Sequence, residues 1–260
     1  MWQKYKIEEK KIYSGRIGKS RFWVIRSNKI WQMAKSLTDE TGNDTEVPVV
    51  INALPESVDW SHQIADKHNT LQILPSTPDR PIVVKPQKVL SILPGMNLDL
   101  YVYIPVWVQF YASSVKQENL LFEFPSTELS STWFGVPDEG ELAYTYPDDI
   151  YFELEKKKFA SDSILCPLRI RNDNAAILNF QRLSIPVEQL NVYWNQQILC
   201  TNEVKVNFKG EEKPNEINIS SSSPSLFEGL KQINSARVST SKNILKKSFT
   251  FIKSIADLNA

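Results

Sequence analysis

Several residue types are scarce in this chain of 260 residues, and each scarcity excludes something. The two cysteines, Cys166 and Cys200, fit neither a metal-ligand nor a redox spacing, so we expect buried free thiols in a reducing compartment. No apolar run approaches the ~18 residues of a membrane span. The N-terminus leads into charged residues from Glu8 to Lys11, where a secretory signal would be apolar. The sequence therefore predicts a soluble cytoplasmic protein.

Net charge is also missing, since 30 basic residues balance 30 acidic ones. No global field draws such a chain to nucleic acid or to anionic lipid, so any electrostatic partner must be recruited by a local patch. Single-stranded nucleic acid would need exposed aromatics interleaved with basic residues. The segment from Phe22 to Trp31 supplies only a faint version of that pattern, and we do not expect nucleic-acid binding.

The sequence contains no complete catalytic or cofactor motif. Gly15 to Ser20 ends in Gly-Lys-Ser like a phosphate-binding loop, but Tyr13 stands where that motif needs glycine. The following residues, Phe22 to Arg26, indicate a strand where the motif needs a helix, so we expect a turn between strands. A serine nucleophile elbow of the form Gly-x-Ser-x-Gly is absent too.

Histidine is scarce as well, with only His62 and His68 in the chain. Two imidazoles six residues apart fit neither a helical pair nor one face of a turn, although Asp59, Asp66 and Asn69 lie nearby. We expect a solvated loop here, and we expect the chain to use no metal and no cofactor.

The chain is rich in short runs of Val, Ile, Phe, Tyr and Trp separated by turn residues, which is typical of a sandwich or barrel. Two such runs flank Ser27 to Lys29 and predict a hairpin. The sequence favours an all-β fold made of two packed antiparallel β-sandwich-like units, residues 1–113 and 114–209. A single continuous barrel-like body is the alternative.

The C-terminal residues 210–260 have a different composition. The polar stretch 210–225 predicts a linker, and Ser241 to Leu258 predicts a basic amphipathic helix. Residues 241–260 contain four lysines and one aspartate, a net charge of plus three, which suits an anionic membrane surface or a partner protein. The alternative is a helix packed on its own body, because one apolar stripe serves both purposes. The candidate membrane- or partner-binding residues are Lys242, Leu245, Lys246, Lys247, Phe249, Ile252, Lys253 and Ile255.

Two segments are candidates for ligand binding. Trp133 and Phe134 precede Gly135, which predicts either a packed corner or an aromatic binding site. Asp79 and Arg80 precede a predicted strand. They form either a structural ion pair at the strand entry or half of an anion-binding site. The candidate ligand-binding residues are Asp79, Arg80, Trp133, Phe134, Gly135, Glu141 and Tyr144.

Acidic residues are interleaved with aromatic ones between positions 133 and 149. They cluster at Asp138 to Glu141 and at Asp148-Asp149, and paired carboxylates can hydrolyse glycosides. A carbohydrate- or ester-active hydrolase using this region is therefore the alternative function, with solvated turns beside core aromatics as the plainer interpretation.

Several strings resemble a prokaryotic domain-of-unknown-function family, number 432. Thr-Trp-Phe-Gly at 132–135 and Pro-Leu-Arg-Ile-Arg-Asn at 167–172 are the most specific of them. The others are residues 78–86, 93–95, 104–108, 129–130 and 140–144. The resemblance covers most of the body and implies no catalytic residue, and a basic, apolar C-terminal segment is similar to one in family members.

The leading functional hypothesis is a non-enzymatic binding or scaffold protein. In it, a rigid β-body carries a tether whose helix docks on a partner protein or on the inner face of the membrane. No small-molecule ligand can be named from the sequence.

Overall fold

The structure is a computed structural model that describes residues 1–38, 47–65, 68–135, 137–138, 140–145, 150–154, 161–210, 215–239 and 252–253. Over these residues the fold is all-β, which confirms the predicted class. Besides strands, the described elements are two short 3₁₀ turns, η1 (Gln117–Asn119) and η3 (Val187–Gln189). The same residues contain no helix long and apolar enough to cross a membrane.

The chain divides into two compact units, and each takes two separate stretches of sequence. Unit 1 consists of Met1–Ser76 and Pro105–Glu128, and unit 2 of Thr77–Ile104 and Leu129–Ala260. These boundaries differ from the predicted 1–113 and 114–209. The reason lies in strand pairing, because the strand that ends at Ser76 forms a ladder with the strand that begins at Trp107.

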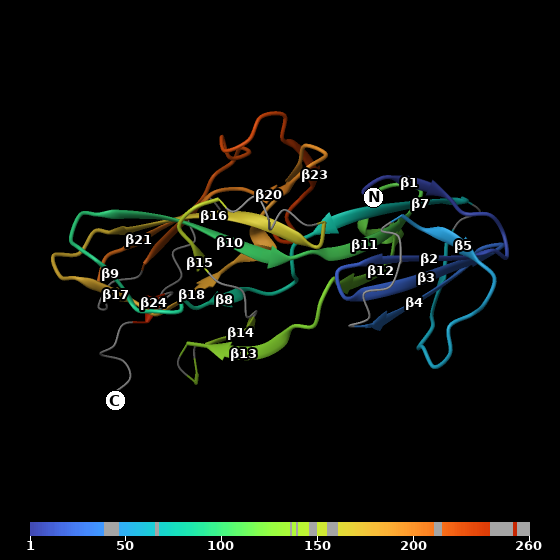
Figure 1. The fold of residues 1–260 in the computed structure, drawn as a ribbon, viewed down its shortest axis with the longest axis horizontal. Helices are drawn as coiled ribbons and strands as arrows, with labels where there is room; N and C mark the ends of the chain where they lie inside the picture. Colours follow the sequence, from blue (N-terminus) through green and yellow to red (C-terminus); the bar gives the residue numbers. More distant parts are fainter. Residues whose placement is uncertain are drawn as a thin grey trace. The chain divides into compact units, whose positions relative to one another are not determined.

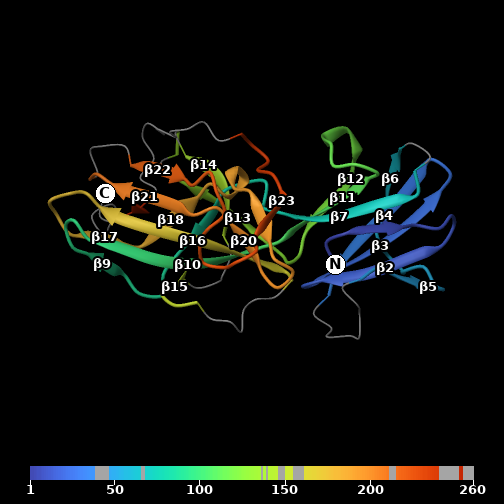
Figure 2. The same cartoon turned by 90° about the horizontal axis from the view of Figure 1, so that it is seen from above.

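Unit 1 contains two antiparallel sheets (Figures 1 and 2). The first has the order β5-β2-β3-β4-β6, with β2 to β4 side by side in blue. Its strands are β2 (Ile12–Ile17), β3 (Ser20–Ser27), β4 (Ile30–Leu37), β5 (Val49–Ile51) and β6 (Ser61–Ile64). The second has the order β1-β7-β11-β12. Its strands are β1 (Lys4–Lys6), β7 (Thr70–Ser76), β11 (Trp107–Ala112) and β12 (Leu120–Pro125).

An aromatic cluster joins the two sheets of unit 1. The ring of Phe22 on β3 lies 5.0 Å from that of Phe110 on β11 and 6.0 Å from that of Phe124 on β12, measured between centroids. All three side chains are buried. Since β3 belongs to one sheet and β11 and β12 to the other, unit 1 packs sheet on sheet, as expected of a sandwich-like unit.

Unit 2 contains three sheets. The eight-stranded one runs β15-β10-β16-β20-β19-β23, with β21 beside β16 and β22 beside β21. Its strands are β10 (Asn97–Pro105), β15 (Ile150–Tyr151), β16 (Ser163–Asn172), β19 (Val192–Trp194), β20 (Leu199–Thr201), β21 (Val204–Phe208), β22 (Glu216–Ile219) and β23 (Lys231–Asn234). A two-stranded sheet pairs β9 (Leu90–Ile92) with β17 (Leu178–Phe180).

The third sheet of unit 2 has the order β13-β14-β8-β18-β24, and we call it the hairpin sheet. Its strands are β8 (Ile82–Val84), β13 (Ser130–Phe134), β14 (Glu141–Thr145), β18 (Arg182–Ile185) and β24 (Ile252–Lys253). Here β14 pairs with β8 in parallel, and β16 in the larger sheet is parallel to β20 and β21. Unit 2 is therefore mixed, where the sequence predicted antiparallel sheets only. Parallel neighbours require crossovers between strands distant in sequence, which local turn signals do not reveal.

The predicted linker at 210–225 is wrong for the residues described. Strand β22 pairs antiparallel with β21, and the side chains of Asn215 and Ile217 are buried. The composition of this segment is polar and did not predict a strand, because only alternate residues of this edge strand face the core.

The predicted C-terminal helix is not seen. Residues 240–251 and 254–260 lie outside the described residues, and with them Lys242, Leu245, Lys246, Lys247, Phe249 and Ile255. Ile252 and Lys253 form β24, which pairs with Leu183 and Arg182 of β18. At these two positions the backbone is extended, where the sequence predicted helix.

Candidate functional site

The β13–β14 hairpin brings together most of the residues predicted to bind a ligand. Trp133 lies opposite Leu142 in the antiparallel register, and Phe134 lies opposite Glu141. Directly opposed residues share a face, and successive residues alternate between faces. Trp133, Leu142 and Tyr144 therefore lie on one side, which we call the Trp133 face, and Phe134 and Glu141 lie on the other, the Phe134 face.

The Trp133 face is buried over the centre of the hairpin sheet and exposed at its β13 side. By register with Tyr144, Ile82 of β8 lies on this face, and Ile185 of β18 lies opposite Ile82. Both side chains are 1% exposed, whereas Trp133 is 49% and Leu142 44% exposed. An apolar surface that begins as core thus continues into a half-exposed pair.

A polar cluster borders that pair. The phenol of Tyr144 donates a hydrogen bond of 2.9 Å to Asp79 Oδ1, and Arg80 Nε lies 3.8 Å from Asp79 Oδ2. The Arg80 guanidinium lies over the Tyr144 ring, 5.4 Å from its centroid. Partial burial and the bond to Asp79 raise the pKa of Tyr144, so this phenol remains a donor at neutral pH. The structure thus joins Asp79 and Arg80 to Tyr144.

The Phe134 face carries the remaining predicted residues. The Phe134 side chain is fully buried, packs with Val83 and Ala143, and has the Arg182 guanidinium 5.6 Å from its ring centroid. Glu141 Oε1 accepts a 3.2 Å hydrogen bond from the hydroxyl of Ser184. Phe134 is therefore a packing residue, and the sheet separates it and Glu141 from Trp133 and Tyr144.

Gly135 follows β13 with φ of 114°, a conformation that favours glycine. It ends the strand directly after the paired residues. Of the acidic residues beyond it, Asp138 and Glu141 are described, whereas Glu139, Asp148 and Asp149 lie outside the described residues.

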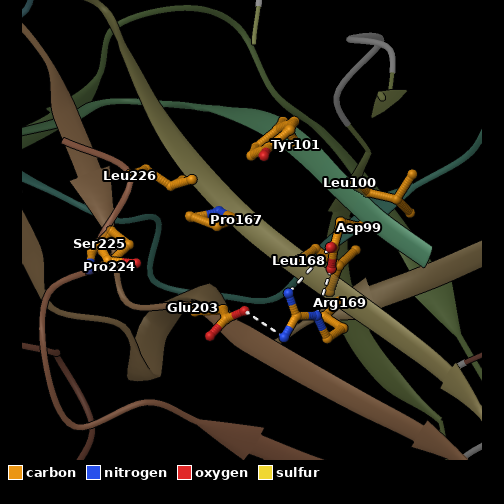
Figure 3. A pocket seen from close by; sticks show the side chains of 10 residues that line it. All are labelled: Asp99, Leu100, Tyr101, Pro167, Leu168, Arg169, Glu203, Pro224, Ser225 and Leu226. Atoms are coloured by element: carbon orange, nitrogen blue, oxygen red, sulfur yellow. Dashed lines mark hydrogen bonds and ion pairs between the residues drawn. The ribbon is translucent and has the colours of Figure 1, made fainter. Parts of the chain in front are cut away.

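Sequence reasoning missed a pocket in unit 2 (Figure 3). It is a hollow of about 130 Å³ lined by Asp99, Leu100, Tyr101, Pro167, Leu168, Arg169, Glu203, Pro224, Ser225 and Leu226. None of the seven predicted ligand-binding residues lines it. The available signal was the charged residues of two largely apolar strands, Asp99 of β10 and Arg169 of β16.

Arg169 lies between two carboxylates at this pocket (Figure 3). Its Nε and Nη2 donate to Asp99 at 2.5 and 3.1 Å, and its Nη1 lies 3.8 Å from Glu203. The hydrogen bond to Asp99 is the main cause that raises the pKa of Arg169. Because Asp99 already occupies two guanidinium donors, the pocket resembles a surface ion-pair network more than an anion site.

The Gly15 to Ser20 segment contains a turn between two strands, as predicted. Gly18 and Lys19 connect β2 to β3, and the backbone N–H groups of Lys19 and Ser20 both donate to the carbonyl of Ser126. The Ser20 hydroxyl donates to the carbonyl of Pro125. The donors that would cradle a phosphate are therefore engaged with β12 and the residue after it.

His62 lies on strand β6 rather than in the expected loop, and its Nε2 is 2.9 Å from Gln32 Nε2 on β4. His68 lies between β6 and β7. Across the described residues no group of three or more His, Cys, Asp and Glu side chains could hold a metal ion.

Both cysteines are buried free thiols, as predicted. Burial raises the pKa of Cys166 to about 11, and burial followed by the neighbouring Cys166 raises that of Cys200. Both thiols are protonated at neutral pH and lack the thiolate character of a nucleophile.

The comparison with protein families identifies the chain. The model of the family described as "Protein of unknown function (DUF432)" matches residues 1–253, so the chain belongs to this family and the predicted resemblance is confirmed. No curated protein and no solved structure matches the chain.

Proposed function

We propose that this family member is a non-enzymatic binding protein that holds a protein partner on the Trp133 face of its β13–β14 hairpin. The observation that carries the proposal is the half-exposed pair of Trp133 and Leu142, which continues a buried core face out to the solvent. Contiguous exposed apolar surface bordered by polar groups marks interaction sites.

The polar cluster beside the pair supports the same function. Tryptophan, tyrosine and arginine are enriched at the energetically dominant positions of protein interfaces. Arg80 and Tyr144 are held in place by Asp79 and by each other, so little side-chain entropy is lost when a partner packs against them. A fixed polar rim next to an apolar anchor is the arrangement of an interface.

The alternative, a hydrolase, receives less support from the same geometry. Such an enzyme places two carboxyl groups across one cleft, about 5 to 9 Å apart. Asp79 is bonded to Tyr144, on the Trp133 face, whereas Glu141 points to the Phe134 face. These two carboxylates are therefore poor candidates for a catalytic pair.

Site-specific photo-crosslinking tests the binding proposal, since it captures a protein partner whatever its identity. A benzophenone amino acid replaces Trp133 in one variant and Ile64, which is 83% exposed on β6, in the control. We expect irradiation in the native cell to give a discrete protein adduct from position 133 and none from position 64. Equal adducts from both positions, or none from position 133, would contradict the proposal.

We also propose that residues 241–260 dock on an anionic membrane surface. The support is the local net charge of plus three in a chain whose overall net charge is zero. Flotation with anionic vesicles compares the full chain with a variant in which Lys242, Lys246, Lys247 and Lys253 become glutamine. In the control, four lysines elsewhere (Lys4, Lys6, Lys116 and Lys231) become glutamine. Only the first variant should stop floating, and a wild-type chain that does not float removes this proposal.

A further inference from the structure

We infer that the partner on the hairpin is a second copy of this chain, with the two β13 strands paired antiparallel about a two-fold axis at Thr132. This inference rests on the proposed binding role of the β13–β14 hairpin, and it places the second copy at the β13 edge, beside the Trp133 face. The two hairpin sheets would join into one continuous sheet across the axis.

Strand β13 has an exposed edge position and an unguarded composition. Among the described strands it is the terminal one of the hairpin sheet, so one row of its backbone N–H and C=O groups points away from β14. Proteins guard such edges with lysine, proline or inward charges, but β13 reads Ser-Ser-Thr-Trp-Phe and has none of these. Edge strands β5, β6, β9, β15 and β17 also lack lysine, proline and carboxylates, but they span only two to four residues.

The residues of β13 are also complementary in size to those of a second, antiparallel copy of β13. With Thr132 opposite Thr132, Trp133 lies opposite the small, exposed Ser131 of the second copy, and the reverse holds across the axis. Across the four strands of the joined sheet, the side chains on the Trp133 face then follow the order Leu142, Trp133, Ser131 and Tyr144. The last two belong to the second copy. A large residue opposite a small one leaves room for both indoles to cover the seam, since diagonal neighbours lie within reach of aromatic side chains.

Two copies of β13 can also pair without bringing like charges together. Directly opposed like charges destabilise strand pairs, and self-pairing always opposes identical or symmetry-related residues. The five residues of β13 carry no charge, so two copies meet without this penalty. Pairing would also cover part of the half-exposed Trp133 ring of each copy, because Ser131 and the diagonal Trp133 of the other copy become its neighbours.

Charge exchange at the two-fold axis gives a sharp test. Thr132→Lys and Thr132→Glu each place like charges opposite each other, so each variant alone should sediment as a monomer of 29.9 kDa. As its concentration is raised to about 100 μM, wild-type protein should form a dimer that sediments at twice that mass. An equimolar mixture of the two variants should recover the dimer, because opposite charges then face each other. Thr145→Lys and Thr145→Glu are matched controls on β14, exposed and on the same face as Thr132, and should remain dimeric.

The inference fails if the wild-type chain is monomeric over that range, or if the Thr132 variants dimerise as well as the controls do. Circular dichroism checks that the variants fold. Should they unfold, Ser131→Glu at an exposed position gives the same readout. If the chain is monomeric but position 133 still crosslinks to a different protein, the inference of a second copy is wrong and the proposed binding function stands.

Discussion

Asn172 shows how single polar side chains hold unit 2 together. Its Nδ2 donates to the carbonyls of Ile92 and Ala176, each at 2.8 Å, and its Oδ1 accepts from the backbone N–H of Asn174 at 3.0 Å. The side chain is fully buried, so no water replaces a lost partner. Asn172 ends the Pro-Leu-Arg-Ile-Arg-Asn string, and its contacts give that string a structural role.

Asn172→Ala should therefore lower the free energy of unfolding by about 2–4 kcal/mol, because the buried Ile92 carbonyl loses its partner and two part-buried backbone hydrogen bonds are lost. Urea denaturation followed by circular dichroism measures the change. Asn207→Ala, at a half-buried position on β21, is the control and should cost much less. Equal losses in both variants would contradict the structural role of Asn172.

The buried thiols make a second residue-scale prediction, on pH. The pKa of Cys166 is raised from 9.0 to about 11, so above pH 9 the unfolded chain releases a proton that the folded chain retains. Its contribution to stability is fully present below pH 9 and should decline by about 1.4 kcal/mol per pH unit as pH rises towards 11. Urea melts of Cys200→Ala and of the Cys166→Ala/Cys200→Ala double variant across this window isolate the effect, since Cys200, whose pKa depends on Cys166, is absent from both. Parallel stability curves would show that the thiol does not contribute.

At the scale of elements, β22 lies in a segment whose composition predicts a linker. Ile217→Ala should reduce the free energy of unfolding by about 2–4 kcal/mol, because this side chain is 2% exposed and its loss leaves a cavity. Asn218→Ala, on the opposite face of the same strand, should change it far less. A linker would tolerate both substitutions, so an unchanged urea midpoint for Ile217→Ala would restore the linker interpretation.

Position 210, two residues after the end of β21, requires a glycine. Gly210 has φ of +105°, and a Cβ there would come within 2.6 Å of Asn174 Nδ2. Gly210→Ala should therefore lower the midpoint of thermal unfolding through both strain and contact. Gly229→Ala isolates the backbone contribution, since its φ is +72° with no atom within 4 Å of a Cβ. The Gly210 variant should melt at the lower temperature of the two, and the reverse order would contradict the contact.

At the scale of the whole molecule, unit 1 is assembled from two stretches of chain. A fragment of residues 1–113 lacks β12 and with it Phe124, so we expect it to fail to unfold cooperatively. Ser76 lies opposite Trp107 across the β7–β11 ladder. Replacing residues 77–106 with Asn-Gly in a fragment ending at Glu128 puts a two-residue turn between Ser76 and Trp107, and it should therefore close a short hairpin and give a cooperative thermal transition. A cooperative 1–113 fragment would contradict the division into units.

Local patterns in the sequence determined the all-β class, the family, the hairpin at Asn28 and the turn at Gly18-Lys19. Each depends on neighbours within a few residues, where strand alternation and turn chemistry act. Only the tertiary structure decided which distant strands pair, and with that the unit boundaries, the parallel neighbours of β16 and the place of β22. It also divided the predicted site, because register with β14 puts Glu141 on the face of Phe134 and Tyr144 on the face of Trp133. The pocket at Arg169 arises in the same way, from strands and loops that no local pattern links.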